Sequence, residues 1–150
     1  IRFGRQALSE VEHREAGPAM EMCARSVILS AGLVSLMADD NYNCALAHAV
    51  CYGLQNFEHV EREYLHGDLV AYGALVQLAV DGQLDKAREL RAFLVSLGTP
   101  VTLAQMRVPL EKTALHDALV EATTGPDMAH IPYPVTQDMV FDAMRRVETL

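Results

Sequence analysis

The chain has 150 residues, of which 51% are hydrophobic and 21% are charged, and its formal net charge is −8 at pH 7. This length suits a single domain with its own hydrophobic core. The acidic balance argues against nucleic acid and anionic membranes as partners, and apolar runs interrupted by Gly, Asp and Glu argue against a membrane span.

The first third of the chain predicts two helices. Residues 5–15 form a charged amphipathic pattern, and the Gly-Pro pair at 17–18 ends it. Residues 19–37 repeat apolar side chains at intervals of three and four, which predicts a long core helix. Pro18 is favourable as the first residue of this helix, because the nitrogen at that position has no hydrogen-bond partner within the helix and proline has no N–H to leave unpaired. Asp40 or Asn43 is expected to cap the helix that follows.

Two histidines stand out in the middle of the chain. His48 lies among small apolar residues in 44–51, so a helix here would be buried on most sides. His66 precedes the apolar segment 69–80, which is long enough for a central helix. The polar residues 55–65 between them are expected to form a loop that turns one helix back beside the other.

A buried imidazole needs a hydrogen-bond partner or a metal ion. A core histidine bonded to a carbonyl explains His48 alone, but a second histidine on an adjacent helix favours a shared divalent ion such as zinc. Cys51, within one turn of His48, is a further candidate ligand, against inert packing as the alternative. Asp39 and Asp40 could supply a carboxylate, although solvated helix-capping acids are the simpler interpretation.

The remainder of the chain predicts further helices and no strand, so the expected fold class is all-α, a helical bundle. Gly98 and the Gly-Pro pair at 125–126 are helix ends. The expected elements are a helix over 84–97, a short turn over 102–106 that Thr102 caps, a helix over 109–123, an irregular segment over 128–135, and a final helix to 147 that Thr136 caps.

The other histidines are weaker candidates for a site. His13 and His116 lie in charged helices and are expected to face water. His59 lies in the acidic loop, where a solvated side chain is the simpler interpretation. His130 lies in the irregular segment and is a site candidate against a surface histidine as the alternative.

Targeting and redox signals agree with a cytoplasmic protein. No charged-then-apolar leader is present, so we expect no signal peptide. The chain begins at Ile1 rather than Met, and we expect it to be a piece of a longer protein. Its cysteines, Cys23, Cys44 and Cys51, show no pairing pattern and fit a reducing compartment.

The residues around the two histidines resemble the metal-binding core of glycerol dehydrogenases, in the iron-containing alcohol dehydrogenase superfamily. The resemblance runs from about Ser26 to the end of the chain. It rests on Ala-His-Ala-Val-x-x-Gly-Leu at 47–54, His-Gly-Asp-x-Val-Ala-x-Gly at 66–73, Gly-Thr-Pro-Val-Thr-Leu-Ala-Gln at 98–105, and Met-Ala-His-Ile-Pro at 128–132.

This resemblance implies that His48 and His66 are catalytic residues and two of three protein ligands to a zinc or iron ion. The third ligand of the family is an aspartate in an upstream Gly-Asp-Ala-Leu segment, which this sequence lacks. The family's glycine-rich nucleotide-binding domain is also missing. Residues 1–150 are therefore expected to be the C-terminal helical metal-binding domain, inactive alone. Cys51 stands where the family often has a second histidine.

For the intact enzyme, the resemblance implies NAD-dependent oxidation of a small polyol or other alcohol by a homo-oligomer. The divalent metal polarises the substrate hydroxyl, which prepares the carbon for hydride transfer. Two alternatives remain open: a non-enzymatic helical module with a structural metal site, and a dehydroquinate synthase-like enzyme. The Thr-Leu-Ala-Gln stretch at 102–105 favours the polyol dehydrogenase branch.

Overall fold

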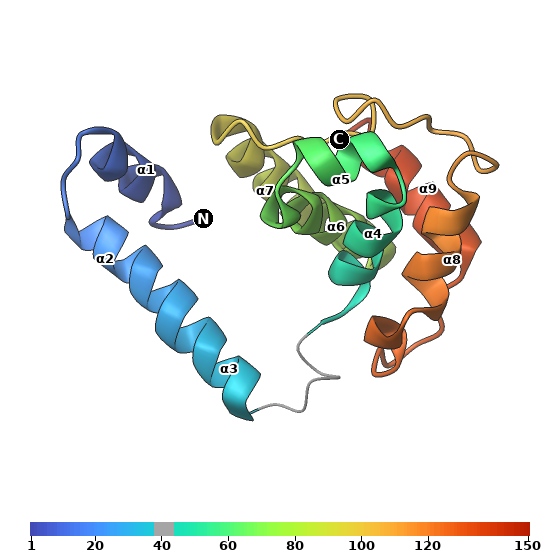
Figure 1. Cartoon of the computed structure of the whole chain (residues 1–150), viewed down its shortest axis with the longest axis horizontal. Coiled ribbons are helices and arrows are strands. Elements are labelled where there is room, and N and C mark those ends of the chain that lie inside the picture. The colour runs from blue at the N-terminus through green and yellow to red at the C-terminus, as the bar shows by residue number, and fades with distance from the viewer. Residues whose placement is uncertain (38–43) are drawn as a thin grey trace. The chain divides into compact units, whose positions relative to one another are not determined.

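A computed structural model describes residues 1–37 and 44–150, which fold into helices joined by turns (Figure 1). These described ranges contain no strand, and the all-α prediction is confirmed. The chain divides into two compact units, residues 1–43 and 44–150.

The first unit contains two packed helices. α1 (Gly4–Glu12) contacts α2 (Pro18–Arg25), which continues through a π-helical segment, η1 (Ser26–Ala31), into α3 (Gly32–Met37). Both predicted helices are confirmed, with Pro18 as the first residue of α2. In the described part of this unit, however, nothing covers the apolar side chains of η1 and α3; Val27 is 71% exposed and Leu36 is 85% exposed. The predicted core role of this helix is therefore not observed.

The helix over Pro18–Met37 is also long and apolar enough to cross a membrane, with a mean hydropathy of 1.4. We expected charged residues to interrupt every apolar run of this length. In this helix, however, the charged residues Glu21 and Arg25 both lie near the N-terminal end, and the rest of the helix is uninterrupted. The core helix of a soluble protein passes the same test of length and composition, so one such helix is weak evidence for a membrane span.

Glu10 joins α1 to the start of α2. Its buried carboxylate accepts hydrogen bonds from the backbone amides of Met20 at 2.7 Å and Ala19 at 3.4 Å. These are amides of the first turn, which have no partner within the helix, and the negative charge also suits the helix dipole. The fit is close, because a Cβ at Gly17 would lie 2.3 Å from the carboxyl carbon of Glu10.

The second unit is built around one central helix, α6, which contacts α4, α7 and α9, while α4 also contacts α8 (Figure 1). The side chains that α6 buries lie on several sides, among them Leu69, Tyr72, Leu75 and Val76. The elements in chain order are α4 (Leu46–Gln55), α5 (Glu58–Glu63), α6 (His66–Val80), α7 (Leu84–Ser96), α8 (His116–Thr124), a 3-10 turn η3 (Pro126–Met128) and α9 (Gln137–Val147).

Two glycines let α4 lie against its neighbours with backbone contact. A Cβ at Gly73 of α6 would lie 2.1 Å from the carbonyl oxygen of Ala47 in α4. A Cβ at Gly53 of α4 would lie 2.5 Å from the carbonyl oxygen of Ala118 in α8. Any larger residue at either position would force the helices apart.

The predicted helix ends are confirmed where glycine or a capping hydroxyl sets them. Gly98 follows α7 with φ of 76°, a value that favours glycine. Gly82, which was not among the predicted ends stated above, follows α6 in the same way with φ of 71°. The Thr136 hydroxyl accepts the Met139 amide at the start of α9. The predicted caps Asp40 and Asn43 lie outside the described residues, and the N-cap of α4 is Ala45.

Two element predictions are wrong. The predicted loop 55–65 contains the helix α5, because Val60 is buried and gives that segment one apolar face. The predicted helix 109–123 begins only at His116. Leu110 is 37% exposed, and the segment that contains it forms turns because it has little apolar surface to bury.

Candidate metal centre

α4 and α6 bring His48 and His66 together. His48 lies in the first turn of α4, and His66 is the first residue of α6. Their ring centroids are 5.6 Å apart, with the ring planes tilted by 42°. The backbone contact at Gly73 and a hydrogen bond of 3.1 Å from the Ala47 amide to the Gln77 side chain hold the two helices at this spacing.

The arrangement fits two ligands of one metal ion. With metal–nitrogen bonds of about 2 Å and a tetrahedral angle, two imidazole centroids lie roughly 5 Å apart. His48 is half-buried and His66 is exposed, so the pair can be reached from solvent. Within the described ranges, the His48 ring has no hydrogen bond to a carbonyl, which weakens the alternative of a satisfied core histidine.

Tyr52 and Cys51 complete the surroundings of the pair. The Tyr52 ring lies 6.4 Å from the His48 ring and 6.0 Å from the His66 ring, centroid to centroid. The Cys51 sulfur is 3.5 Å from Nδ1 of His66. Both side chains project from α4, which places an aromatic face and a thiol next to the two imidazoles.

Burial favours the neutral forms of His48 and Cys51. Desolvation lowers the pKa of His48, the charge of His66 lowers it further, and only Asp127 acts in the opposite direction. Burial raises the pKa of the Cys51 thiol to about 11, so it carries its proton at neutral pH. A neutral imidazole is the form that binds metal ions.

A third ligand is not found in the described part of the chain, where no three His, Cys, Asp or Glu side chains gather closely enough to hold an ion. Asp39 and Asp40, the acids considered from sequence, lie outside the described residues. Asp127 on η3 acts electrostatically on His48. It also hydrogen-bonds the Cys44 thiol, whose pKa is raised, chiefly by burial and then by this carboxylate.

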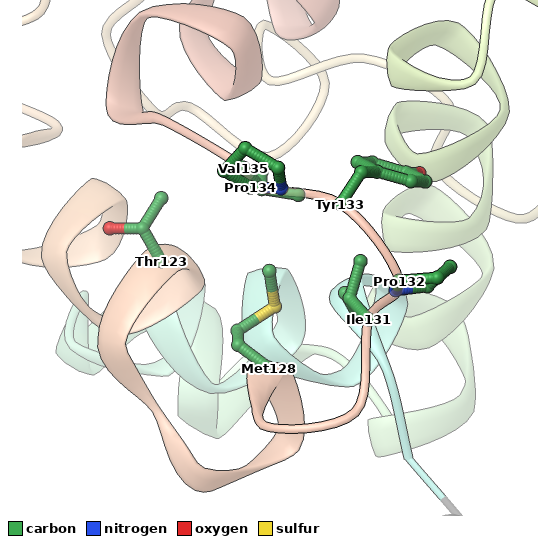
Figure 2. Close-up of a pocket in the computed structure, with 7 residues that line it drawn as sticks. All are labelled: Thr123, Met128, Ile131, Pro132, Tyr133, Pro134 and Val135. Carbon is green, nitrogen blue, oxygen red and sulfur yellow. The ribbon is translucent and has the colours of Figure 1, made fainter.

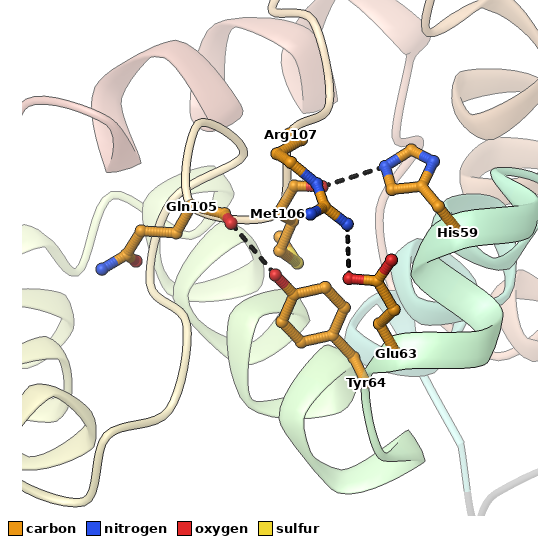
Figure 3. Close-up of polar contacts among 6 residues, drawn as sticks. All are labelled: His59, Glu63, Tyr64, Gln105, Met106 and Arg107. Atoms are coloured by element: carbon orange, nitrogen blue, oxygen red, sulfur yellow. Dashed lines mark hydrogen bonds and ion pairs between the residues drawn. The ribbon is translucent and has the colours of Figure 1, made fainter.

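A cluster of polar contacts fixes the segment before His66. The His59 ring nitrogen lies 3.1 Å from the Met106 carbonyl oxygen, and the Tyr64 hydroxyl donates to the Gln105 carbonyl oxygen at 3.0 Å (Figure 3). His59 is half-buried, so the solvated interpretation of this histidine is wrong. These contacts attach α5, and through it the start of α6, to the turn over 101–108, where an ion pair from Arg107 to Glu63 adds a further link.

The remaining histidines are His13, His116 and His130. His13 and His116 are exposed, as predicted. His130 is also exposed, and it does not line the neighbouring hollow of about 470 Å³. That hollow is formed by Thr123, Met128 and the segment 131–135 (Figure 2). The Tyr133 hydroxyl, which hydrogen-bonds Asp81, has its pKa raised to about 12, mainly by that bond.

Sequence reasoning did not identify Tyr52 or Asp127. Tyr52 follows His48 by four residues, so helical spacing could have placed it on the same face. Asp127 comes from a segment almost eighty residues further along the chain, and no local pattern connects it with His48.

Known proteins are similar to this chain over most of its length. Hydroxycarboxylate dehydrogenase A of Escherichia coli is 32% identical over 146 residues, covering 96% of this chain and 40% of that protein. Glycerol dehydrogenase of Thermotoga maritima is 29% identical over 99% of this chain and 40% of its own length. Glycolaldehyde reductase of Halobacterium salinarum is 30% identical over 94% of this chain and 38% of its own length. No family model matches the sequence.

Proposed function

The chain belongs to the glycerol dehydrogenase branch of the iron-containing alcohol dehydrogenase superfamily, and on that premise we propose that it is the metal-binding part of an NAD-dependent polyol or alcohol dehydrogenase. It spans about 40% of the length of the curated relatives it matches. The rest of such an enzyme would supply the nucleotide-binding fold and the third ligand. We therefore expect this chain alone to be inactive.

The observation that carries this proposal is the pair of imidazoles. His48 and His66 come from different helices, lie 18 residues apart in sequence, and present rings 5.6 Å apart on an accessible face. Zinc accepts nitrogen ligands at this spacing and keeps an open position when it is catalytic, and iron is the alternative ion. The named activities of the relatives are dehydrogenations or reductions, which favours the enzyme over a structural metal module and over a dehydroquinate synthase-like enzyme.

The chain's own residues would bind the metal ion and would orient and shield the substrate. His48, whose pKa is lowered, stays neutral and keeps a nitrogen lone pair available near pH 7. His66 projects from the first position of α6, where the helix fixes its backbone. Tyr52 offers an aromatic wall against which the carbon chain of a small polyol could pack. When bound, the divalent ion supplies Lewis-acid polarisation of a substrate hydroxyl.

Zinc titration by calorimetry tests the proposal. The wild-type chain should bind one zinc ion weakly, because two neutral ligands leave the coordination incomplete. His48→Ala and His66→Ala should each abolish that binding. His116→Ala, which removes an exposed histidine on α8, should leave it unchanged. Zinc binding that survives the loss of His48 or His66 would show that the ligands lie elsewhere and would remove the main support for the proposal.

The remaining features of the intact enzyme belong to the same proposal. Small polyols are the expected substrates, because adjacent hydroxyls can both reach one ion, and NAD is the expected hydride acceptor. We also propose a homo-oligomer in the cytoplasm. These features rest on family membership, and a full-length protein that oxidises glycerol with NAD would support them.

A further inference from the structure

The Cys51 thiol makes two contacts with a single residue. Cys51 is fully buried, at 0% exposed, and follows His48 by three positions on α4. Its sulfur lies 3.5 Å from Nδ1 of His66 and 3.9 Å from the main-chain carbonyl oxygen of His66. The thiol therefore touches both the ring and the backbone of the same histidine.

The chemistry of these two contacts relates the thiol proton to the tautomer of His66. Both contacts can be hydrogen bonds at the same time in only one arrangement. A carbonyl oxygen can only accept, so in that arrangement the thiol proton is donated to the carbonyl. The proton between sulfur and Nδ1 then belongs to the ring, with sulfur as the weak acceptor. In this arrangement His66 is protonated on Nδ1 and unprotonated on Nε2.

We propose that Cys51 is a positioning residue that holds His66 in its Nδ1–H tautomer, with the Nε2 lone pair available to an ion shared with His48. Histidines that bind metal ions almost always donate their other ring N–H to a neighbouring acceptor, which fixes the tautomer and the ring orientation. Here that acceptor is a sulfur atom on the helix that carries the other histidine. In its metal-binding aspect this inference rests on the proposed function.

This role differs from both sequence-based interpretations of Cys51, as inert packing or as a thiolate ligand. Inert packing does not account for a thiol directed at Nδ1 and at the carbonyl of one residue. A sulfur that contacts Nδ1 of His66 supports the ring nitrogen that does not bind the ion, and it is not itself a ligand. His66 is also exposed, and beside the neighbouring rings of His48 and Tyr52 the thiol provides a polar contact to its ring.

The direct test is the tautomer of His66 in the metal-free chain. Long-range proton–nitrogen NMR of chain labelled with ¹⁵N-histidine distinguishes a protonated from an unprotonated ring nitrogen. Wild type should show Nδ1 protonated. Cys51→Ser, which can still accept and donate, should keep that tautomer, and Cys51→Ala should move His66 towards the Nε2–H tautomer that free histidine prefers. Val50→Ala, which trims a buried neighbour on α4, should leave the tautomer unchanged.

Zinc affinity provides the second readout. Cys51→Ala should weaken zinc binding by about 10-fold to 100-fold, and Cys51→Ser should restore most of it. A wild-type His66 protonated on Nε2 would overturn the inference without any variant. A thiolate-to-metal absorption band in the cobalt-substituted chain, lost in Cys51→Ala, would overturn it as well, because Cys51 would then be a ligand.

The two proposals fail differently. If wild type binds no zinc but the tautomer depends on Cys51, the positioning role stands and the proposed function loses support. If zinc binding requires His48 and His66 while Cys51→Ala changes neither tautomer nor affinity, the proposed function stands and the positioning role is refuted.

Discussion

A single methyl group at Gly73 should separate the two helices that carry the histidines. A Cβ there would lie 2.1 Å from the Ala47 carbonyl oxygen, whereas a carbon–oxygen contact needs about 3.3 Å. The obstructing atom belongs to the backbone, so no side-chain rotation can relieve the clash, and the helices must move apart by about 1 Å. Overpacking of this kind costs about 1–3 kcal/mol, so Gly73→Ala should lower the free energy of unfolding by that amount.

Gly67 provides the matched control. It lies on the same helix, and a Cβ added there meets nothing within 4 Å. Gly67→Ala should leave the free energy of unfolding unchanged or raise it by about 0.5–1 kcal/mol, because alanine is the better helix former. Urea denaturation followed by circular dichroism measures both variants. Zinc titration should show at least about tenfold weaker binding for Gly73→Ala, because a ligand moved by 1 Å no longer fits the ion.

Equal stability and equal zinc binding of the two variants would refute this prediction. If Gly73→Ala and Gly67→Ala unfold at the same urea concentration and bind zinc alike, the backbone contact between α4 and α6 does not set the spacing of His48 and His66. Gly53→Ala gives a second comparison. It should destabilise the α4–α8 contact, where a Cβ would lie 2.5 Å from the Ala118 oxygen, without moving α4 away from α6.

The remaining predictions concern Tyr72, His48 and Glu10, polar groups that are buried or half-buried. Tyr72→Phe should raise the free energy of unfolding by about 1 kcal/mol in urea titrations, because the buried hydroxyl has no hydrogen-bond partner in the described structure. Burial also raises the Tyr72 pKa far above its usual value, so wild type, unlike this variant, should lose stability above about pH 10, where only the unfolded state releases the proton. Burial lowers the pKa of His48, so thermal melts should show stability falling below about pH 6.5, where the unfolded state binds the proton first, and His48→Gln should reduce that slope. Gly17→Ala should displace the Glu10 carboxylate and speed hydrogen exchange at the Met20 amide; unchanged exchange would contradict that contact.

Local sequence signals predicted the elements that carry the site. His48 sits in a run of small apolar residues, and His66 directly precedes a long apolar segment, so both helices could be placed from composition alone. Their adjacency depends on Gly73 meeting Ala47, a contact between positions 26 residues apart. A glycine within a helical pattern indicates close approach of some backbone but does not say which one.

The wrong predictions share a physical cause. Polar residues 55–65 suggested a loop, yet tertiary contacts made by Val60, His59 and Tyr64 stabilise a short helix there. The helix predicted from 109 begins later because Leu110 finds no core to pack against. In both cases burial in the folded chain decides the outcome over local propensity, and burial depends on partners far away in sequence.

Within residues 1–37 and 44–150 no carboxylate joins His48 and His66, which has a consequence for how tightly an ion can bind there. Imidazole ligands such as those proposed here bring no negative charge, and Cys51 carries its proton at neutral pH, so the first contacts of a divalent cation would carry no compensating charge. Asp127 contributes only at longer range, through its effect on His48. A carboxylate ligand would add direct charge neutralisation. If the proposed function holds, binding by this chain should therefore be weak and should strengthen in a longer protein that adds a carboxylate ligand, whereas tight binding by the chain alone would mean that a charged ligand already lies within it.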